Sequence, residues 1–215
     1  MYKRLILCDF DGTIVEFDTV EYILEELVPD SWRIYDEQLE RGEITLAECM
    51  KKEVAMIKKT KNEIISLVEG VKIRSGFKDF AEYCRLNDIP ISIVSAGLDF
   101  LIKHILRINK IGEIPIYAPA ARCYGKRGIV LSFKHLPGNG DFKEGIVENF
   151  REIAMNVSYI GDGIGDYNAA RAADFVFAIK GGKLASFCKR QGLDCVEVSD
   201  FNDIIRYLVE SNKAD

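Results

Sequence analysis

The sequence predicts an α/β fold built on a parallel sheet, with a small all-helical cap inserted after the first strand. The first observation is a set of short, almost wholly apolar runs of strand length, at residues 5–8, 90–95, 114–118, 157–160, 175–179 and 195–198. The second is that segments of helical periodicity, such as 77–87 and 100–108, separate most of these runs. Nearly continuous hydrophobic strands that alternate with helices are typical of a Rossmann-like sheet sandwiched by helices.

Residues 17–72 interrupt this alternation. They contain four segments of helical character and no strand-like run, and these segments are 20–27, 31–41, 46–58 and 61–68. Asn62 is predicted to cap the fourth helix. We therefore expect two parts, a core of residues 1–16 and 73–215 and a helical bundle cap of residues 17–72.

A second irregular stretch, residues 122–141, is rich in glycine and proline around the β-prone run 128–133. Turn residues on both sides of a short apolar run favour a hairpin over a further helix. We expect a small antiparallel excursion on the core here.

The hydrophobic content and net charge of the chain limit the kinds of molecule that it is expected to bind. Of the 215 residues, 48% are hydrophobic, and the net charge is −5 with both signs mixed along the chain. This balance offers no electrostatic reason to expect nucleic acid or an anionic membrane, and no apolar run approaches the roughly 18–20 residues of a membrane span. The six cysteines form no C-x-x-C pair, which fits small buried hydrophobes in a reducing cytoplasm. We expect a cytoplasmic protein whose partner is a small molecule.

The first predicted strand ends on two carboxylates, Asp9 and Asp11, which Gly12 and Thr13 follow. Carboxylates that lie close together repel one another and destabilise a fold. Their presence at a strand end therefore indicates either a bound cation or a reaction that needs them.

Three further stretches carry polar groups at comparable places. Ser95 ends the second predicted strand, and its hydroxyl and the amides of Ala96 and Gly97 suit an anion at a helix start. Asp162 and Asp166 follow another strand, in a glycine-containing loop with neither the spacing of a G-x-G-x-x-G nucleotide loop nor the closing glutamate of a calcium loop. Lys143 precedes a helix. Each stretch alone is more often structural, as a cap or a solvated surface group.

Together these stretches indicate one site, because the carboxyl ends of parallel strands meet at one edge of a sheet. Hard carboxylate oxygens without histidine or cysteine suit Mg²⁺. A lysine and hydroxyl groups add phosphate-binding capacity, so the site fits phosphoryl transfer. One carboxylate can attack phosphorus, the other can move protons, and Lys143 with Mg²⁺ can offset charge on the phosphoryl oxygens.

The order of these motifs resembles the haloacid dehalogenase superfamily of phosphatases. The resemblance implies an aspartyl-phosphate intermediate, with Asp9 as the nucleophile and Asp11 as the acid and base. It also implies that Thr13 or Ser95, with Ala96 and Lys143, binds the phosphate. The implied Mg²⁺ ligands are the side chain of Asp9, the carbonyl of Asp11, Asp162 and Asp166. An acid at Asp11 argues against a true dehalogenase, which needs no such proton donor.

The helical insertion resembles the cap of the phosphoserine phosphatase branch. Within that branch the closer likeness is to the methionine-salvage phosphatases that act on a hydroxy-keto-methylthiopentenyl phosphate, carried by residues 9–18, 72–77, 89–90, 95–100 and 175–191. Phosphoserine phosphatases carry a glutamate at the position of Asp18 and a carboxylate-binding arginine where this chain has Glu53. Phosphoserine stays the alternative substrate.

Two further questions stay open at this point. Asp18 is expected either to contact the substrate or to cap the helix that follows it. A rival from another class is a receiver-type or non-catalytic phosphate-binding signalling domain, which also gathers aspartate, serine or threonine, and lysine around Mg²⁺. In a receiver domain the phosphorylated aspartate follows a middle strand, whereas Asp9 follows the first strand here.

Overall fold

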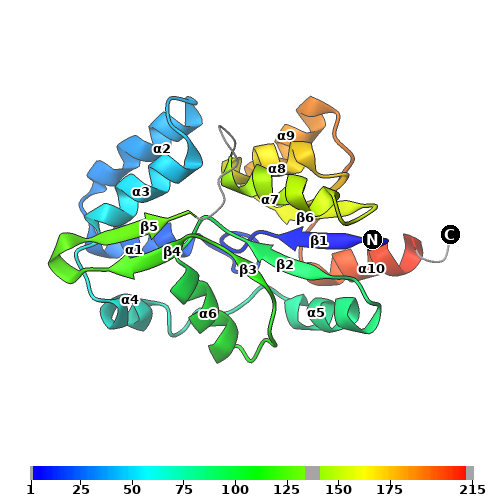
Figure 1. The fold of residues 1–215 in the computed structure, drawn as a ribbon, viewed down its shortest axis with the longest axis horizontal. Coiled ribbons are helices and arrows are strands. Elements are labelled where there is room, and N and C mark those ends of the chain that lie inside the picture. Colours follow the sequence, from blue (N-terminus) through cyan, green and yellow to red (C-terminus); the bar gives the residue numbers. More distant parts are fainter. Residues whose placement is uncertain (1, 134–140, 212–215) are drawn as a thin grey trace.

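The computed structural model describes residues 2–133 and 141–211 and confirms the predicted fold class. A six-stranded, all-parallel sheet has the strand order β3-β2-β1-β6-β7-β8 (Figure 1). Its strands are β1 (Leu5–Cys8), β2 (Ile91–Val94), β3 (Ile116–Tyr117), β6 (Val157–Gly161), β7 (Phe175–Ile179) and β8 (Cys195–Val198). Each lies within or beside one of the apolar runs in the sequence.

Helices cover both faces of the sheet. One face carries α5 (Phe77–Leu86), α6 (Asp99–Ile108) and α10 (Phe201–Ser211), and the other carries α7 (Phe142–Arg151), α8 (Tyr167–Ala172) and α9 (Lys183–Gln191) (Figure 1). Successive side chains of a strand point to opposite faces. Accordingly, Ile6 and Cys8 of β1 join one buried cluster, and Leu5 and Leu7 join another. This two-sided burial explains why the strands are hydrophobic at nearly every position.

The insertion after β1 is helical, as expected. It comprises α1 (Thr19–Leu27), a 3₁₀ turn η1 (Asp30–Trp32), α2 (Arg33–Glu40), α3 (Leu46–Met56) and α4 (Lys61–Leu67). The prediction of Asn62 as a cap is wrong, because Thr60 caps α4 and Glu63 completes a reciprocal capping box with it. The division into a core and a cap of residues 17–72 stays a prediction.

A hairpin accounts for the second irregular stretch. It pairs β4 (Ala120–Cys123) with β5 (Ile129–Ser132) in antiparallel register, with a 3₁₀ turn η2 (Gly125–Arg127) between them. β4 contacts α6 of the core and β5 contacts α3, so the hairpin lies between the core and the inserted helices. Gly128, at φ +89°, lies so close to the Ala55 carbonyl that a side chain would collide there. Residues 134–140 of the predicted excursion lie outside the described residues.

Two further observations concern covalent links and membranes. All six cysteines are free. Within residues 2–133 and 141–211, the helices are too short or too polar to cross a bilayer.

Candidate active site

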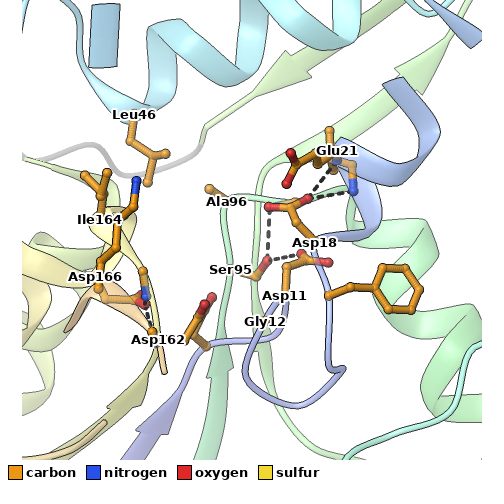
Figure 2. A pocket seen from close by; sticks show the side chains of 18 of the residues that line it. Asp11, Gly12, Asp18, Glu21, Leu46, Ser95, Ala96, Asp162, Ile164 and Asp166 are labelled. Carbon is orange, nitrogen blue, oxygen red and sulfur yellow. Dashed lines mark hydrogen bonds between the residues drawn. The ribbon is translucent and has the colours of Figure 1, made fainter. Parts of the chain in front are cut away.

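The carboxyl ends of β1, β2 and β6 open into a cavity of about 820 Å³ beneath α1, α2 and α3. Figure 2 shows Asp162 and Asp166 on one side of this cavity, Asp11 and Ser95 on the other, and Leu46 of α3 above. The residues predicted from the sequence that line it are Asp9, Asp11, Asp18, Ser95, Ala96, Lys143, Asp162 and Asp166. Thr13 is the one predicted site residue that is not part of the lining.

Three carboxylates lie close together at the floor of the cavity. Asp9, Asp162 and Asp166 each offer one oxygen within 4.8 Å of the others. Burial and the charge of Asp166 raise the pKa of Asp9, and the same two causes raise the pKa of Asp162 to about 7. A divalent cation would relieve this repulsion, and an all-oxygen donor set without histidine or cysteine suits Mg²⁺. The residues present therefore fit the metal that the fold family implies.

Lys143 places a buried positive charge beside these carboxylates. Its Nζ donates to Oδ1 of Asp9 and to Oδ1 of Asp166, both at 2.7 Å. The residue sits in the first turn of α7, whose N-cap Asp141 accepts a hydrogen bond from the Lys143 backbone N–H. Although burial alone lowers the pKa of the ammonium, Asp166 and Asp9 raise it above its usual value. Lys143 consequently stays protonated within reach of Asp9.

Asp166 already has partners on both carboxylate oxygens. Besides Lys143, Oδ1 accepts from the Tyr159 hydroxyl at 2.7 Å, and Oδ2 accepts from the backbone N–H groups of Asp162 and Gly163 at 2.9 and 3.0 Å. Four donors on one carboxylate hold it rigidly and leave it little capacity for a metal. The geometry favours Asp166 as the residue that orients Lys143 and the Asp162 loop.

Asp11 lies across the cavity from this cluster. Its Oδ1 accepts from the Thr19 N–H at 3.0 Å and from the Thr19 hydroxyl at 2.6 Å, while its Oδ2 faces the Ser95 hydroxyl at 3.4 Å (Figure 2). Burial, helped by the charge of Asp18, raises the pKa of Asp11 to about 7. A carboxyl group with such a pKa can both give and take a proton near neutrality.

Thr13 does not have the environment of a phosphate ligand. Its side chain is fully buried, and its hydroxyl donates to Oδ1 of Asp162 at 3.1 Å. Of the two hydroxyls considered from the sequence, only that of Ser95 belongs to a residue lining the cavity. Thr13 instead orients Asp162.

Of its two expected roles, Asp18 has the one that can be seen in the structure, that of a helix cap. Its Oδ1 accepts from the backbone N–H groups of Val20 and Glu21 at 2.8 and 2.9 Å, which makes it the N-cap of α1. Asp18 also lines the cavity. Contact with a substrate therefore stays a prediction for this residue.

Sequence reasoning missed three residues that hold the site together. Tyr159 and Thr19 orient Asp166 and Asp11, as described above. Arg74 donates from Nε to the Thr13 carbonyl at 2.8 Å and from its terminal nitrogen to the Gly12 carbonyl at 2.7 Å. These bonds fix the loop after β1, where Gly12 has φ +74° and lies too close to the Asp162 carboxylate for a side chain. A tyrosine in an otherwise apolar strand was the one available signal, since a buried hydroxyl needs a partner.

The sequence of this chain matches the profile of a known family. The sequence profile described as "haloacid dehalogenase-like hydrolase" matches residues 6–171. The chain belongs to the haloacid dehalogenase-like hydrolase family.

Two similar proteins indicate which class of hydrolase this chain belongs to, because both are phosphatases. The 2-hydroxy-3-keto-5-methylthiopentenyl-1-phosphate phosphatase of Brevibacillus brevis is 31% identical over 217 residues, which cover 97% of this chain and 96% of that protein. A polyol phosphate phosphatase of Saccharomyces cerevisiae is 26% identical, with 95% and 92% of the two chains covered. The enzyme class predicted from the sequence, a phosphatase of this family, is confirmed, and phosphatases of the family generally use Mg²⁺.

A solved structure shares the fold. A phospho-aspartyl intermediate analogue of phosphoserine phosphatase matches with a TM-score of 0.74 over 96% of this chain and 99% of that one. At 20% identity this likeness concerns the fold alone. The resemblance to the phosphoserine phosphatase branch is thus confirmed in architecture.

Proposed function

We propose that this phosphatase hydrolyses a small phosphometabolite with Mg²⁺, through an aspartyl phosphate formed on Asp9. The observation that carries the proposal is the pairing of Asp9 with the protonated Lys143 at 2.7 Å, in a cavity that also holds Asp11. An ammonium group beside the attacking carboxylate offsets the charge that gathers on the phosphoryl oxygens. Attack by a carboxylate divides hydrolysis into two easier steps.

In the first step Asp9 forms a bond to phosphorus and the bond to the leaving oxygen breaks. Asp11 gives its proton to that oxygen, so an alcohol departs. In the second step Asp11 takes a proton from water, the water oxygen attacks phosphorus, and inorganic phosphate leaves with Asp9 restored. The bonds from Thr19 to Asp11 hold the acid in place for both steps.

The other residues bind and orient the reactants. Ser95, the backbone at Ala96 and Lys143 hold the phosphate. The Asp9 and Asp162 side chains and the Asp11 carbonyl hold Mg²⁺, which supplies Lewis-acid stabilisation of the phosphoryl charge. Asp166 supports Lys143 and the Asp162 loop in this assignment, and Thr13 supports Asp162.

For the substrate we propose a phosphate ester with an uncharged leaving group, such as the methionine-salvage hydroxy-keto-methylthiopentenyl phosphate that the Brevibacillus relative is named for. Of the described cavity residues between positions 17 and 72, none is lysine, arginine or histidine. Glu53 lies in that wall beside Asp36, and this acidic pair gives the carboxylate of phosphoserine no positive partner. These charges favour the neutral substrate over phosphoserine, the alternative.

The signalling-domain alternative is disfavoured by the family membership and by the helices inserted directly after β1. Six free cysteines are consistent with a reducing compartment, and we propose the cytoplasm.

The experiment is a comparison of kcat/KM on the methionine-salvage intermediate, a sugar phosphate and phosphoserine. We expect phosphoserine to be the poorest of the three. A preference for phosphoserine of more than about tenfold, roughly 1.4 kcal/mol of transition-state binding, would overturn the substrate assignment.

A further inference from the structure

Arg74 holds three consecutive carbonyl groups of the loop that follows Asp11. Its terminal nitrogen donates to the Gly12 carbonyl at 2.7 Å and its Nε to the Thr13 carbonyl at 2.8 Å. Its backbone N–H donates to the Ile14 carbonyl at 2.6 Å. Within the described part of the chain, no other group donates to any of these three carbonyls. The position of this stretch of backbone therefore depends on one residue from a distant part of the sequence.

The loop that Arg74 holds also places the Asp162 carboxylate. Gly12 lies so close to this carboxylate that a side chain would collide with it, and the Thr13 hydroxyl donates to Oδ1 of Asp162 at 3.1 Å. The Asp11 carbonyl, one peptide earlier, accepts no hydrogen bond from the described residues. Two of the groups assigned to Mg²⁺ above, the Asp162 carboxylate and the Asp11 carbonyl, are thus attached to backbone that Arg74 holds.

The chemistry of the Arg74 side chain suits the task of fixing a backbone. In the described residues no carboxylate forms an ion pair with its guanidinium, although the side chain lines a cavity rich in acids. Hydrogen bonds from a charged donor are stronger than those from a neutral one. The planar fork of a guanidinium also spans two acceptors at once, which a lysine ammonium does less rigidly.

We propose that Arg74 is a positioning residue for the metal site. By holding the carbonyls of Gly12 and Thr13, it keeps the Asp11 carbonyl and the Asp162 carboxylate in the places from which they bind Mg²⁺. Loss of a residue that orients metal ligands typically changes metal affinity or activity by roughly 10–100-fold. This inference rests on the proposed function, because Mg²⁺ and its ligands belong to that proposal.

The test measures Mg²⁺ binding to Arg74→Met, which removes the side-chain donors, and to Arg74→Lys, which keeps the charge. Without substrate, Mg²⁺ should raise the midpoint of thermal unfolding, because a ligand that binds the folded state stabilises it. For the same rise we expect Arg74→Met to need about tenfold more Mg²⁺ than the wild type, and Arg74→Lys about threefold more. The Mg²⁺ concentration for half-maximal hydrolysis of p-nitrophenyl phosphate should shift by the same factors.

Lys72→Met is the matched control. Lys72 lies two residues before Arg74, is exposed and does not line the cavity. Its substitution removes the same charge, so a general electrostatic effect on Mg²⁺ would appear in both variants. A merely structural role of Arg74 would lower the unfolding midpoint in metal-free buffer and leave the Mg²⁺ requirement unchanged.

The outcomes separate the two proposals. A wild-type protein whose unfolding midpoint and activity do not respond to Mg²⁺ would overturn the metal assignment of the proposed function. A wild type that responds, with equal Mg²⁺ requirements for Arg74→Met and Lys72→Met, would overturn the role of Arg74 alone. If Arg74→Met does not fold, Arg74→Lys decides, and a wild-type Mg²⁺ requirement in that variant would overturn the inference.

Discussion

Replacing Asp166 with asparagine should lower the free energy of unfolding of the protein, whereas the same change at Asp162 should leave it almost unchanged. The Asp166 carboxylate accepts four hydrogen bonds, from Lys143, Tyr159 and two backbone amides. An asparagine side chain accepts through one oxygen only and turns its NH₂ group toward the other two donors. Two buried donors would then lose their acceptor.

The magnitude follows from these contacts. Each buried donor left unsatisfied costs about 1–3 kcal/mol, and relief of the repulsion among the three carboxylates offsets part of the sum. We expect Asp166→Asn to lower the free energy of unfolding by about 2–4 kcal/mol in metal-free buffer. Asp162 accepts one side-chain hydrogen bond, from Thr13, which the asparagine oxygen can keep, so Asp162→Asn should change stability by less than about 1 kcal/mol.

The assay is urea denaturation of both variants, with equal denaturant dependence as the check that the unfolding transition is unchanged. Activity provides the complementary measurement: Asp162→Asn should raise the Mg²⁺ concentration needed for half-maximal activity. Wild-type stability for Asp166→Asn, or a larger loss of stability for Asp162→Asn, would refute the view that Asp166 organises the site.

Three further predictions concern the metal, the pair of carboxyl groups formed by Asp36 and Glu53, and Asp18 as the N-cap of α1. Activity on a generic phosphomonoester should vanish in EDTA, return with Mg²⁺ and be inhibited by Ca²⁺, whose looser and higher coordination spoils in-line geometry; full activity in chelator would contradict the metal assignment. Burial and the charge of Asp36 raise the pKa of Glu53 from its ordinary 4.5 to about 8, with Asp18 adding to the shift. The folded state therefore holds the proton of Glu53 more tightly than the unfolded state does. As the pH rises from 4.5 to about 8, the free energy of unfolding of the wild type relative to Glu53→Gln should fall by at most about 1.4 kcal/mol per pH unit. Urea denaturation at a series of pH values measures this, and a parallel pH dependence of the two proteins would contradict it. Asp18→Ala should cost about 1 kcal/mol in thermal unfolding through loss of the cap, and Asp18→Asn should cost far less; equal losses would show that the cap is not the cause.

The parts of the fold that the sequence predicts are those determined by local pattern. Apolar runs such as 157–160 mark strands because both faces of the sheet are covered, and polar residues at the strand ends mark the site because parallel strands share one edge. The same local logic placed Asp9, Ser95 and Asp162 in one cavity. It failed at Asn62, where the threonine two residues earlier forms a stronger, reciprocal cap with Glu63.

What could not be predicted depends on contacts between distant segments. Arg74 supports the loop at Gly12 across 62 positions, and Thr13 reaches Asp162 across 149. No periodicity or motif encodes such pairs, since each partner alone is an ordinary polar residue. The placement of the β4–β5 hairpin against α3 is of the same kind, because it depends on the close backbone approach at Gly128.

The most direct test of the central claim is to find the covalent intermediate. Enzyme quenched in acid during turnover of a phosphomonoester, then digested and measured by mass spectrometry, should carry one phosphoryl group on the peptide of β1, at Asp9. Asp9→Asn should carry none and should lose turnover while it keeps the wild-type unfolding transition. Turnover by Asp9→Asn near the wild-type rate, or a phosphoryl group located on another residue, would contradict the account.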